Sequence, residues 1–410
     1  TDGIKSLAPT AALLFFAIIF FGIMIDVGLF DPLVRGILRL VRNDPMKLVV
    51  GTAVLAMVVS LDGDGSTTFI IVTSALLPLY LKLGVSPVIL TVVAGLANGT
   101  MNIIPWGGPT VRAASALGIS PSEVFVPMVP SLIAGLVIVL LFSIHLGLME
   151  RCRLGSLVFD QEMVSVVGGG DTGRPARRTG GGAGGDSDGG AGQFIDGLDP
   201  QRDTLRPKLL WFNAALTVAL LVVLVMDILP IPVLFMIAAS IALTVNFPKV
   251  KEQGEAIARH SASIVSVVAM VLAAAVLTGV FSGTGMVEAM AEWLLGVIPS
   301  SMGPFLAVIT GVLSIPLTFF MTNDAFYFGI LPVLTETAAQ YGIEPVEMAR
   351  ASITGQPVHL QSPLVPAILL LVTLAGVSLA DHHKKVLWRA TVVSLAMLAV
   401  GVLLGQIPMG

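Results

Sequence analysis

Charged residues are scarce in this chain of 410 residues: Asp, Glu, Lys and Arg make up 12% of it, against roughly 25% in an average soluble domain. Hydrophobic residues make up 55%, and the mean hydropathy is +0.93. So little charge cannot cover the surface of a water-soluble fold of this length. The sequence therefore predicts an integral membrane protein.

Cysteine is nearly absent as well, and Cys152 stands alone. A single thiol excludes a disulfide framework and a metal cage built from thiolates. The net charge of −4 leaves no basic surface to follow a phosphate backbone, so no nucleic-acid partner is expected.

Long uncharged runs are what the chain does have. Crossing the hydrocarbon core takes about 20 apolar residues, and these runs are apolar all round, without the alternation of a transmembrane barrel strand. An all-α polytopic membrane protein is predicted. The expected plain transmembrane helices are Leu7–Ile25, Val124–Met149, Leu209–Met226, Ile228–Phe247, Ser261–Val287 and Ala390–Gly410.

Two other apolar regions are interrupted by polar or helix-breaking residues. Leu48–Leu61 is too short to cross and is followed at once by Gly65–Leu81, which predicts a re-entrant hairpin over residues 46–82. The next region, residues 83–117, is interrupted at Asn98-Gly99-Thr100, at Asn102 and at Pro105–Pro109. Such residues unwind helices, so a broken transmembrane helix is expected there.

The chain also repeats itself. Residues 258 positions apart match at the same places in the hydropathy profile of the two halves, as in 342 − 84 = 258. For the first two pairs below the separation is 257, as in 279 − 22 = 257. The matched pairs are Gly22 with Gly279, Gly28 with Gly285, Gly84 with Gly342, Pro87 with Pro345, Asn98 with Gln356, Pro105 with Pro363, Gly118 with Gly376, Ser120 with Ser378, and Glu123 with Asp381.

The repeat predicts a second hairpin over residues 302–341, with its tip at Thr322-Asn323-Asp324, and a second broken helix over residues 346–380. The first repeat then covers residues 1–154 and the second residues 208–410. Residues 155–207 are rich in glycine and are expected to be a linker that does not fold.

Lys and Arg residues flank the linker, which predicts that it is cytoplasmic. Following the spans from there, the hairpins enter from opposite sides, so the repeats have inverted topology. The first repeat has no counterpart of the two helices that precede Ser261 in the second. About two further N-terminal helices, roughly 40 residues, are therefore expected in the native protein, unless the repeat is asymmetric.

Two tips and two broken helices should meet near the bilayer midplane, where transporters built from inverted repeats bind their substrates. Glycine allows close approach of the backbone, and half-helix N-termini favour an anion. The candidate substrate-binding residues are Gly65, Ser66, Thr67, Asn98, Thr100, Asn102, Thr322, Asn323, Thr354, Gly355 and Gln356.

The acidic residues of the tips, Asp62, Asp64 and Asp324, are the candidate metal ligands. An ionised Asp at membrane depth costs roughly 2.5–3.5 kcal/mol, so each needs a cation or a proton. A bare tricarboxylate would be repelled, whereas a divalent metal chelated by an organic acid fits, because hard cations prefer oxygen ligands. The same three residues and His359 are the candidates for proton coupling.

Alternative roles stand beside several of these residues. The Asp residues of the first tip would also be stable in water at a surface turn. The side chains of Asn98, Asn102 and Gln356 would serve equally well by bonding backbone groups freed in unwound helices. His359 would either relay protons or cap a carbonyl. Arg112 would either hold a carboxylate or anchor at the outer interface.

Two other functions compete with uptake of a metal complex. A cation–proton antiporter would use the same carboxylates without an organic acid. An intramembrane aspartyl protease would use two of them as its catalytic pair, but it would need neither a repeat nor paired glycine-rich tips. No enzyme activity is therefore expected.

Three segments resemble the bacterial citrate–divalent metal–proton symporters, which belong to the ion-transporter superfamily. They are Ser60-Leu61-Asp62-Gly63-Asp64-Gly65-Ser66-Thr67-Thr68, Asn102-Ile103-Ile104-Pro105-Trp106-Gly107-Gly108-Pro109-Thr110 and Thr322-Asn323-Asp324-Ala325. The resemblance covers nearly the whole chain except the linker.

The resemblance implies uptake of citrate with Mg²⁺ or Ca²⁺, driven by protons, across the inner (plasma) membrane, with no permanently bound cofactor. It also implies a homodimer with an elevator mechanism, in which interfacial arms over Phe30–Asn43 and Phe247–His260 join scaffold and moving domain. Dicarboxylate relatives carry Ser-Asn-Thr at both tips. Gly65-Ser66-Thr67 and Thr322-Asn323-Asp324 depart from this, which favours metal with proton over sodium.

Overall fold

The structure is a computed structural model that describes residues 2–41, 44–63, 65–154, 202–226, 228–297 and 299–409. All regular elements in these ranges are helices, as predicted. Seven helical stretches are long and apolar enough to cross a membrane: Ala8–Asp26, Pro45–Asp62, Gly65–Lys82, Pro121–Leu154, Pro207–Leu224, Ser301–Phe320 and Leu379–Leu403. The predicted linker, apart from its last residues, and Asp64 lie outside the described ranges.

The first half forms a hairpin, a broken helix and one long helix. Its elements are α1 (Asp2–Asp26), α2 (Asp31–Val41), α3 (Pro45–Val59), η1 (Ser60–Asp62), α4 (Gly65–Lys82), α5 (Pro87–Met101), α6 (Gly108–Leu117), α7 (Pro121–Phe125), η2 (Val126–Met128) and α8 (Val129–Leu154).

The second half repeats this series after two additional helices. Its elements are η4 (Pro207–Leu209), α10 (Leu210–Val225), α11 (Ile231–Asn246), α12 (Val250–Arg259), α13 (Ser261–Gly283), α14 (Met286–Val297), η5 (Ser300–Phe305), α15 (Leu306–Phe320), η6 (Ala325–Ile330), α16 (Leu331–Ala339), α17 (Pro345–Ser352), η7 (Ile353–Gly355), α18 (Gln356–His359), α19 (Pro366–Leu374) and α20 (Leu379–Leu403).

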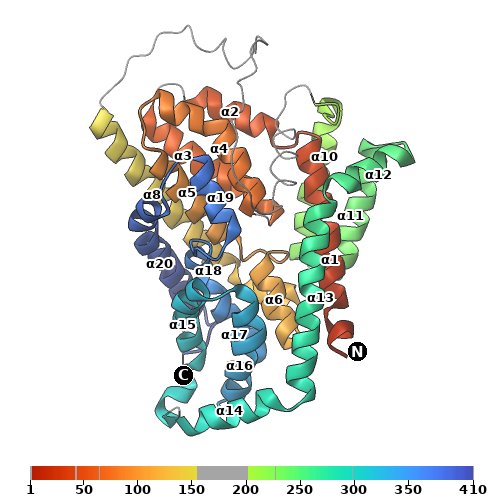
Figure 1. The fold of residues 1–410 in the computed structure, drawn as a ribbon, viewed down its shortest axis with the longest axis vertical. Coiled ribbons are helices and arrows are strands. Elements are labelled where there is room, and N and C mark those ends of the chain that lie inside the picture. Colours follow the sequence, from red (N-terminus) through yellow and green to blue (C-terminus); the bar gives the residue numbers. More distant parts are fainter. Residues whose placement is uncertain are drawn as a thin grey trace, which may run out of the picture.

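Two groups of helices are visible in Figure 1. Helices α1, α10, α11 and α13 stand together on the right of the view, and α1 packs along both α11 and α13. The hairpins, the broken helices, α8 and α20 form the larger group on the left, and α14 crosses the bottom of the view. The broken helices lie inside this larger group.

Matched glycines of the two halves adopt the same left-handed backbone conformation. The φ angles are 87° and 70° at Gly28 and Gly285, 66° and 79° at Gly84 and Gly342, and 68° and 64° at Gly118 and Gly376. Residues with a Cβ rarely adopt this conformation. The repeat inferred from sequence is thus reproduced in the backbone.

Helix starts repeat in the same way. Pro87 and Pro345 are the first residues of α5 and α17. Ser120 caps α7, accepting from the backbone of Ser122, and Ser378 caps α20, accepting from the backbone of Asp381. A hydroxyl at this position satisfies a helix N–H that has no partner within the helix.

Several boundaries differ from the sequence prediction: α11 covers only Ile231–Asn246, α13 ends at Gly283 and α20 ends at Leu403. Three larger differences have a structural reason or shift a helix start. The helical stretch that precedes the first tip runs over Pro45–Asp62 and is long enough to cross, because Pro45 at its first turn and Asp44, which caps it, extend it towards the N-terminus. Helix α5 continues through Asn98-Gly99-Thr100 and ends at Met101, since packing on all sides outweighs the low helix propensity of these residues. Helix α20 begins well before Ala390, at Leu379.

One polar cluster lies where the predicted arm α2 begins and where the predicted arm α12 ends. Asp26, at the end of α1, is buried, and its carboxylate accepts from Arg259 Nε at 3.0 Å and lies 3.2 Å from His260 Nε2. Arg202 donates to the carbonyl oxygen of Asp26 at 2.9 Å and pairs with Asp31 at 3.0 Å. The turn before α2 is therefore tied to the turn between α12 and α13.

Candidate functional site

The two broken helices meet backbone to backbone where α5 of the first half crosses α18 of the second half. A Cβ added to Gly99 would lie 3.0 Å from the Cα of Pro357 and 3.3 Å from the Cβ of Leu360. A residue without a side chain permits this approach of α5 to α18 without displacing either backbone. Residues far apart in the sequence thereby come together at the centre of the larger helix group.

The first tip is held to α5 by Asn98. The Asn98 amide donates to Ser60 Oγ at 2.9 Å and reaches Thr68 Oγ1 at 3.5 Å, while the two hydroxyls lie 3.2 Å apart. A Cβ added to Gly65 would lie 3.0 Å from Asn98 Oδ1. Asn98, Ser60 and Thr68 are all buried. This network fixes both arms of the hairpin against the broken helix.

Trp106, in the interruption between α5 and α6, holds the same tip from the other side. Its indole N–H donates to the carbonyl oxygen of Leu61 at 2.8 Å, and its ring lies 3.2 Å from where a Cβ of Gly63 would be. Phe21 of α1 stacks on the indole with centroids 5.5 Å apart, and Phe235 of α11 meets it edge-on at 5.2 Å. Through Trp106, Leu61 is thus held against helices α1 and α11.

The second tip is held by Gln356, the repeat partner of Asn98. The Gln356 amide donates to Asn323 Oδ1 at 3.2 Å and to the Tyr327 hydroxyl at 2.9 Å. Its carbonyl oxygen accepts from Asn102 Nδ2 at 3.2 Å, which links the two broken helices. Gln356 itself is fully buried. In each half an amide side chain of the broken helix therefore holds the tip of its own hairpin.

A charged contact also crosses between the halves. Arg112 of α6 donates from Nε to Asp324 Oδ1 at 2.7 Å. The Arg112 side chain is 14% exposed and that of Asp324 is 38% exposed. Arg112 therefore lies at the second tip, where it contacts a carboxylate of the protein itself.

The carboxylates of the tips differ in burial. Asp62, at the end of η1, is buried, and Asp324 is half-buried beside Arg112. In the part of the chain that the structure describes, no group of three or more His, Cys, Asp or Glu is placed to hold a metal ion. Mg²⁺ usually keeps several waters and binds one or two protein carboxylates together with a substrate, so one or two Asp residues suffice for a metal that arrives with its own ligands.

Several predicted residues face away from the tips or make only local contacts. Thr100 bonds the carbonyl oxygen of Leu96 and lies against Gly135 of α8. Thr354 bonds the carbonyl oxygen of Ala351, and a Cβ on Gly355 would lie 2.5 Å from Ser314 Oγ of α15. The contacts of these three positions are with neighbouring turns or with the helices packed against the broken helices.

His359 and the remaining tip residues are the other residues predicted for the site. The Nδ1 atom of His359 lies 2.6 Å from the carbonyl oxygen of Thr318, which is the carbonyl-capping arrangement considered from the sequence. Thr322 Oγ1 accepts from the backbone N–H of Ala325 at 3.2 Å. Ser66 and Thr67 lie in the first turn of α4, and Thr67 is buried.

Four contacting residues were missed by the sequence prediction: Ser60, Thr68, Trp106 and Tyr327. Ser60, Thr68 and Trp106 stand within the segments that carry the family resemblance. Tyr327 lay in an apolar run and carried one available signal, because a buried tyrosine hydroxyl usually needs a hydrogen-bond partner. Its hydroxyl also donates to the carbonyl oxygen of Ser352 at 3.3 Å.

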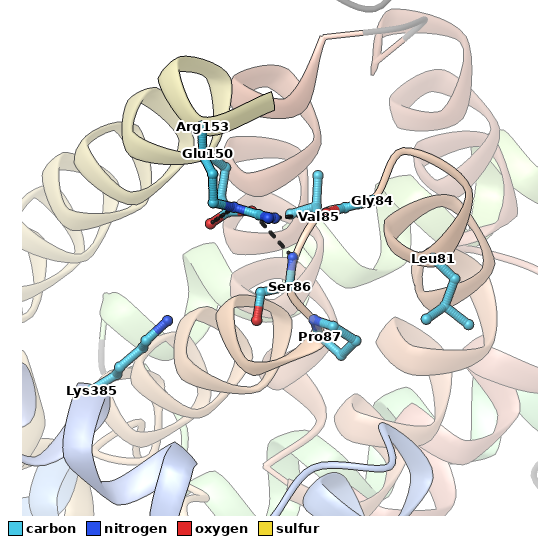
Figure 2. Close-up of a pocket in the computed structure, with 8 residues that line it drawn as sticks. All are labelled: Leu81, Gly84, Val85, Ser86, Pro87, Glu150, Arg153 and Lys385. Carbon is cyan, nitrogen blue, oxygen red and sulfur yellow. Dashed lines mark hydrogen bonds and ion pairs between the residues drawn. The ribbon is translucent and has the colours of Figure 1, made fainter. Parts of the chain in front are cut away.

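A surface pocket of about 560 Å³ lies elsewhere, between the α4–α5 turn and the end of α8 (Figure 2). Its acidic residue, Glu150, accepts from Arg153 and from the backbone N–H of Ser86 at 3.2 Å, and Arg153 donates to the carbonyl oxygen of Gly84 at 2.7 Å. These groups bind one another across the turn. Their hydrogen bonds connect the end of the hairpin to α8. None of the predicted site residues lines this pocket.

A family model described as "CitMHS: Citrate transporter" matches residues 4–355. This chain belongs to the CitMHS family of citrate transporters. It is a transporter and not an enzyme, so the protease alternative is wrong.

Curated relatives from Bacillus subtilis (strain 168) match along nearly the whole chain. The chain is 48% identical over 407 residues to a protein named "Citrate transporter", covering 99% of this chain and 88% of the relative. It is 46% identical to the "Mg(2+)/citrate complex secondary transporter", covering 99% and 87%. It is 42% identical to "Uncharacterized transporter YraO", covering 99% and 88%.

A solved structure shares the fold at low identity. The YdaH transporter of Alcanivorax borkumensis, whose crystal structure is described as revealing an unusual topology, matches with a TM-score of 0.59 at 13% identity. The match covers 100% of this chain and 88% of that chain. The comparison supports the helical membrane fold alone.

Proposed function

We propose that this citrate transporter takes up citrate as a complex with a divalent metal, Mg²⁺ or Ca²⁺, coupled to protons. The complex would bind where the two tips meet the two broken helices. The observation that supports this proposal most directly is the pair of amide-held tips, with Asn98 at one and Gln356 at the other. The relative named as a transporter of the Mg²⁺–citrate complex supports the same cargo.

Each part of the proposed site suits one part of the complex. Asp62 and Asp324, with Asp64, would ligate the metal, because carboxylate oxygens are the ligands that hard divalent cations prefer. Hydroxyl and amide groups at the tips would contact citrate: Ser66, Thr67, Asn98, Asn102, Thr322, Asn323 and Gln356. Gly65, at the N-terminus of α4, would admit the anion to backbone N–H groups.

The remaining parts of the proposal concern movement across the membrane. We place the Gly-rich segment, residues 155–207, in the cytoplasm and the two hairpins in inverted orientations in the plasma membrane. The larger helix group would move as an elevator against α1, α10, α11 and α13, in a homodimer. Protons would replace the metal on the Asp carboxylates during return, with His359 as a further candidate.

Uptake of radiolabelled citrate into proteoliposomes tests the proposal. We expect uptake to rise with added Mg²⁺ or Ca²⁺, to fall to background with excess EDTA, and to increase with an inward proton gradient. Asp324→Asn should abolish the metal-dependent part. Glu336→Gln is the matched control, since Glu336 is an exposed carboxylate on the same hairpin.

The outcomes separate the competing functions. Citrate uptake that is undiminished in EDTA would refute transport of the complex. Metal-driven proton movement without any citrate would favour the cation–proton antiporter. Full uptake by the Asp324→Asn variant at saturating metal would remove Asp324 from the site.

A further inference from the structure

The Arg112–Asp324 pair brings two opposite charges into contact within the site proposed above. The two atoms in contact are 2.7 Å apart, and both side chains are partly buried. The pair joins α6 of the first half to the tip of the second. Its position matters because Asp324 is also a proposed metal ligand, and one carboxylate cannot fully serve Arg112 and a cation at once.

We infer that Arg112 and Asp324 exchange partners with the cargo, so that the pair selects the metal–citrate complex over either component. The metal takes the Asp324 carboxylate, and a citrate carboxylate takes its place on the Arg112 guanidinium. This inference rests on the proposed function and deepens it. It assigns Arg112 as a residue that determines specificity.

The reason lies in the cost of separating a partly buried ion pair. Removing one partner leaves the other charge without its counter-charge, at a cost that solvent reduces because the Asp324 side chain is 38% exposed, whereas exchanging both partners together preserves neutrality. A bare cation would draw Asp324 away from Arg112 and would itself be repelled by the guanidinium. A bare citrate would pair with Arg112 and leave Asp324 facing an anion. Only the complex carries both signs.

The surroundings of Arg112 suit it to receive an anion. Helix α6 begins at Gly108, and a Cβ there would lie 2.6 Å from Nη1 of Arg112. The glycine therefore leaves room for the guanidinium to fold back over the first turn of the helix, where the helix dipole adds positive potential. The planar guanidinium can hold a carboxylate through two parallel hydrogen bonds. An anion beside Arg112 is therefore stabilised by the guanidinium charge and by the dipole of α6.

Binding calorimetry on the purified protein tests the exchange with three probes: MgCl₂ alone, citrate in excess EDTA, and Mg²⁺–citrate. Wild type should bind the complex at least tenfold more tightly than either component. Arg112→Gln should gain at least tenfold in affinity for Mg²⁺ alone. Asp324→Asn should gain as much for citrate in EDTA. Arg35→Gln and Glu336→Gln, at exposed positions, should behave as wild type.

The double variant Arg112→Gln/Asp324→Asn decides the matter if a single variant does not fold, because it removes both charges together. Its preference for the complex over the components should fall at least tenfold. Single variants that only lose affinity, or a double variant with an unchanged preference, would overturn the exchange. Wild type that binds no Mg²⁺–citrate would instead refute the proposed function.

Discussion

Replacing Gln356 by Met tests whether one amide side chain holds the second tip. Gln356 is fully buried and bonds Asn102, Asn323 and the Tyr327 hydroxyl. Met has a similar length and fills the same space, but it has no hydrogen-bond donor and its sulfur is only a weak acceptor. Asn102 and Asn323 each lose a partner, at about 1–3 kcal/mol for each group left unsatisfied.

We therefore expect Gln356→Met to destabilise the protein by about 2–4 kcal/mol, towards the lower end of the summed range because both Asn side chains are only partly buried. Citrate uptake should fall by at least tenfold, since a tip displaced from the broken helix no longer presents Asn323 and Asp324 together. Chemical unfolding in detergent measures the first effect and proteoliposome uptake the second. Gln340→Met is the control, because Gln340 is exposed.

The refuting result is specific. A Gln356→Met variant with wild-type stability and uptake would mean that the three hydrogen bonds carry no net energy. A variant that loses stability but transports normally would mean that Gln356 supports the fold without positioning the tip.

Two further substitutions probe the first broken helix. Trp106→Phe keeps an aromatic ring against Phe21 but removes the donor to the Leu61 carbonyl oxygen. We therefore expect the free energy of unfolding to fall by about 1–3 kcal/mol and the KM for citrate in uptake assays to rise. An unchanged KM would contradict positioning by the indole. Gly107→Ala would place its Cβ in a clash with the Asn102 carbonyl oxygen, so the interruption must distort, and we expect no uptake and a lower Tm. Gly254→Ala is its control because nothing lies within 4 Å there, and normal uptake by Gly107→Ala would show that the interruption can rearrange freely.

Much of the fold was predictable because it depends on local properties of the chain. Hydropathy located most of the spans, since about 20 apolar residues have one dominant use in a membrane protein. Glycine and proline located the turns: Gly84 and Gly342 both occupy left-handed positions. The repeat supplied the second hairpin, which charge and hydropathy alone indicated less clearly.

Predictions failed where packing outweighed local preference. Asn98-Gly99-Thr100 was expected to interrupt the helix, yet α5 continues to Met101, because Gly99 is where α18 packs against it. Thr100 was expected to face the site and instead lies against Gly135. The rotation of a helix about its axis sets these directions, and composition does not reveal it.

Composition, hydropathy and helix-breaking residues thus determined that the chain forms apolar helices long enough to cross a membrane and where two of the helices break. These are short-range consequences of transfer free energy and backbone sterics. The tertiary structure alone decided which polar groups meet: Arg112 with Asp324, Trp106 with Leu61, and Asn102 with Gln356. Those contacts require long-range packing to bring together residues that are distant in the chain, and hydrogen bonds act only over about 3 Å.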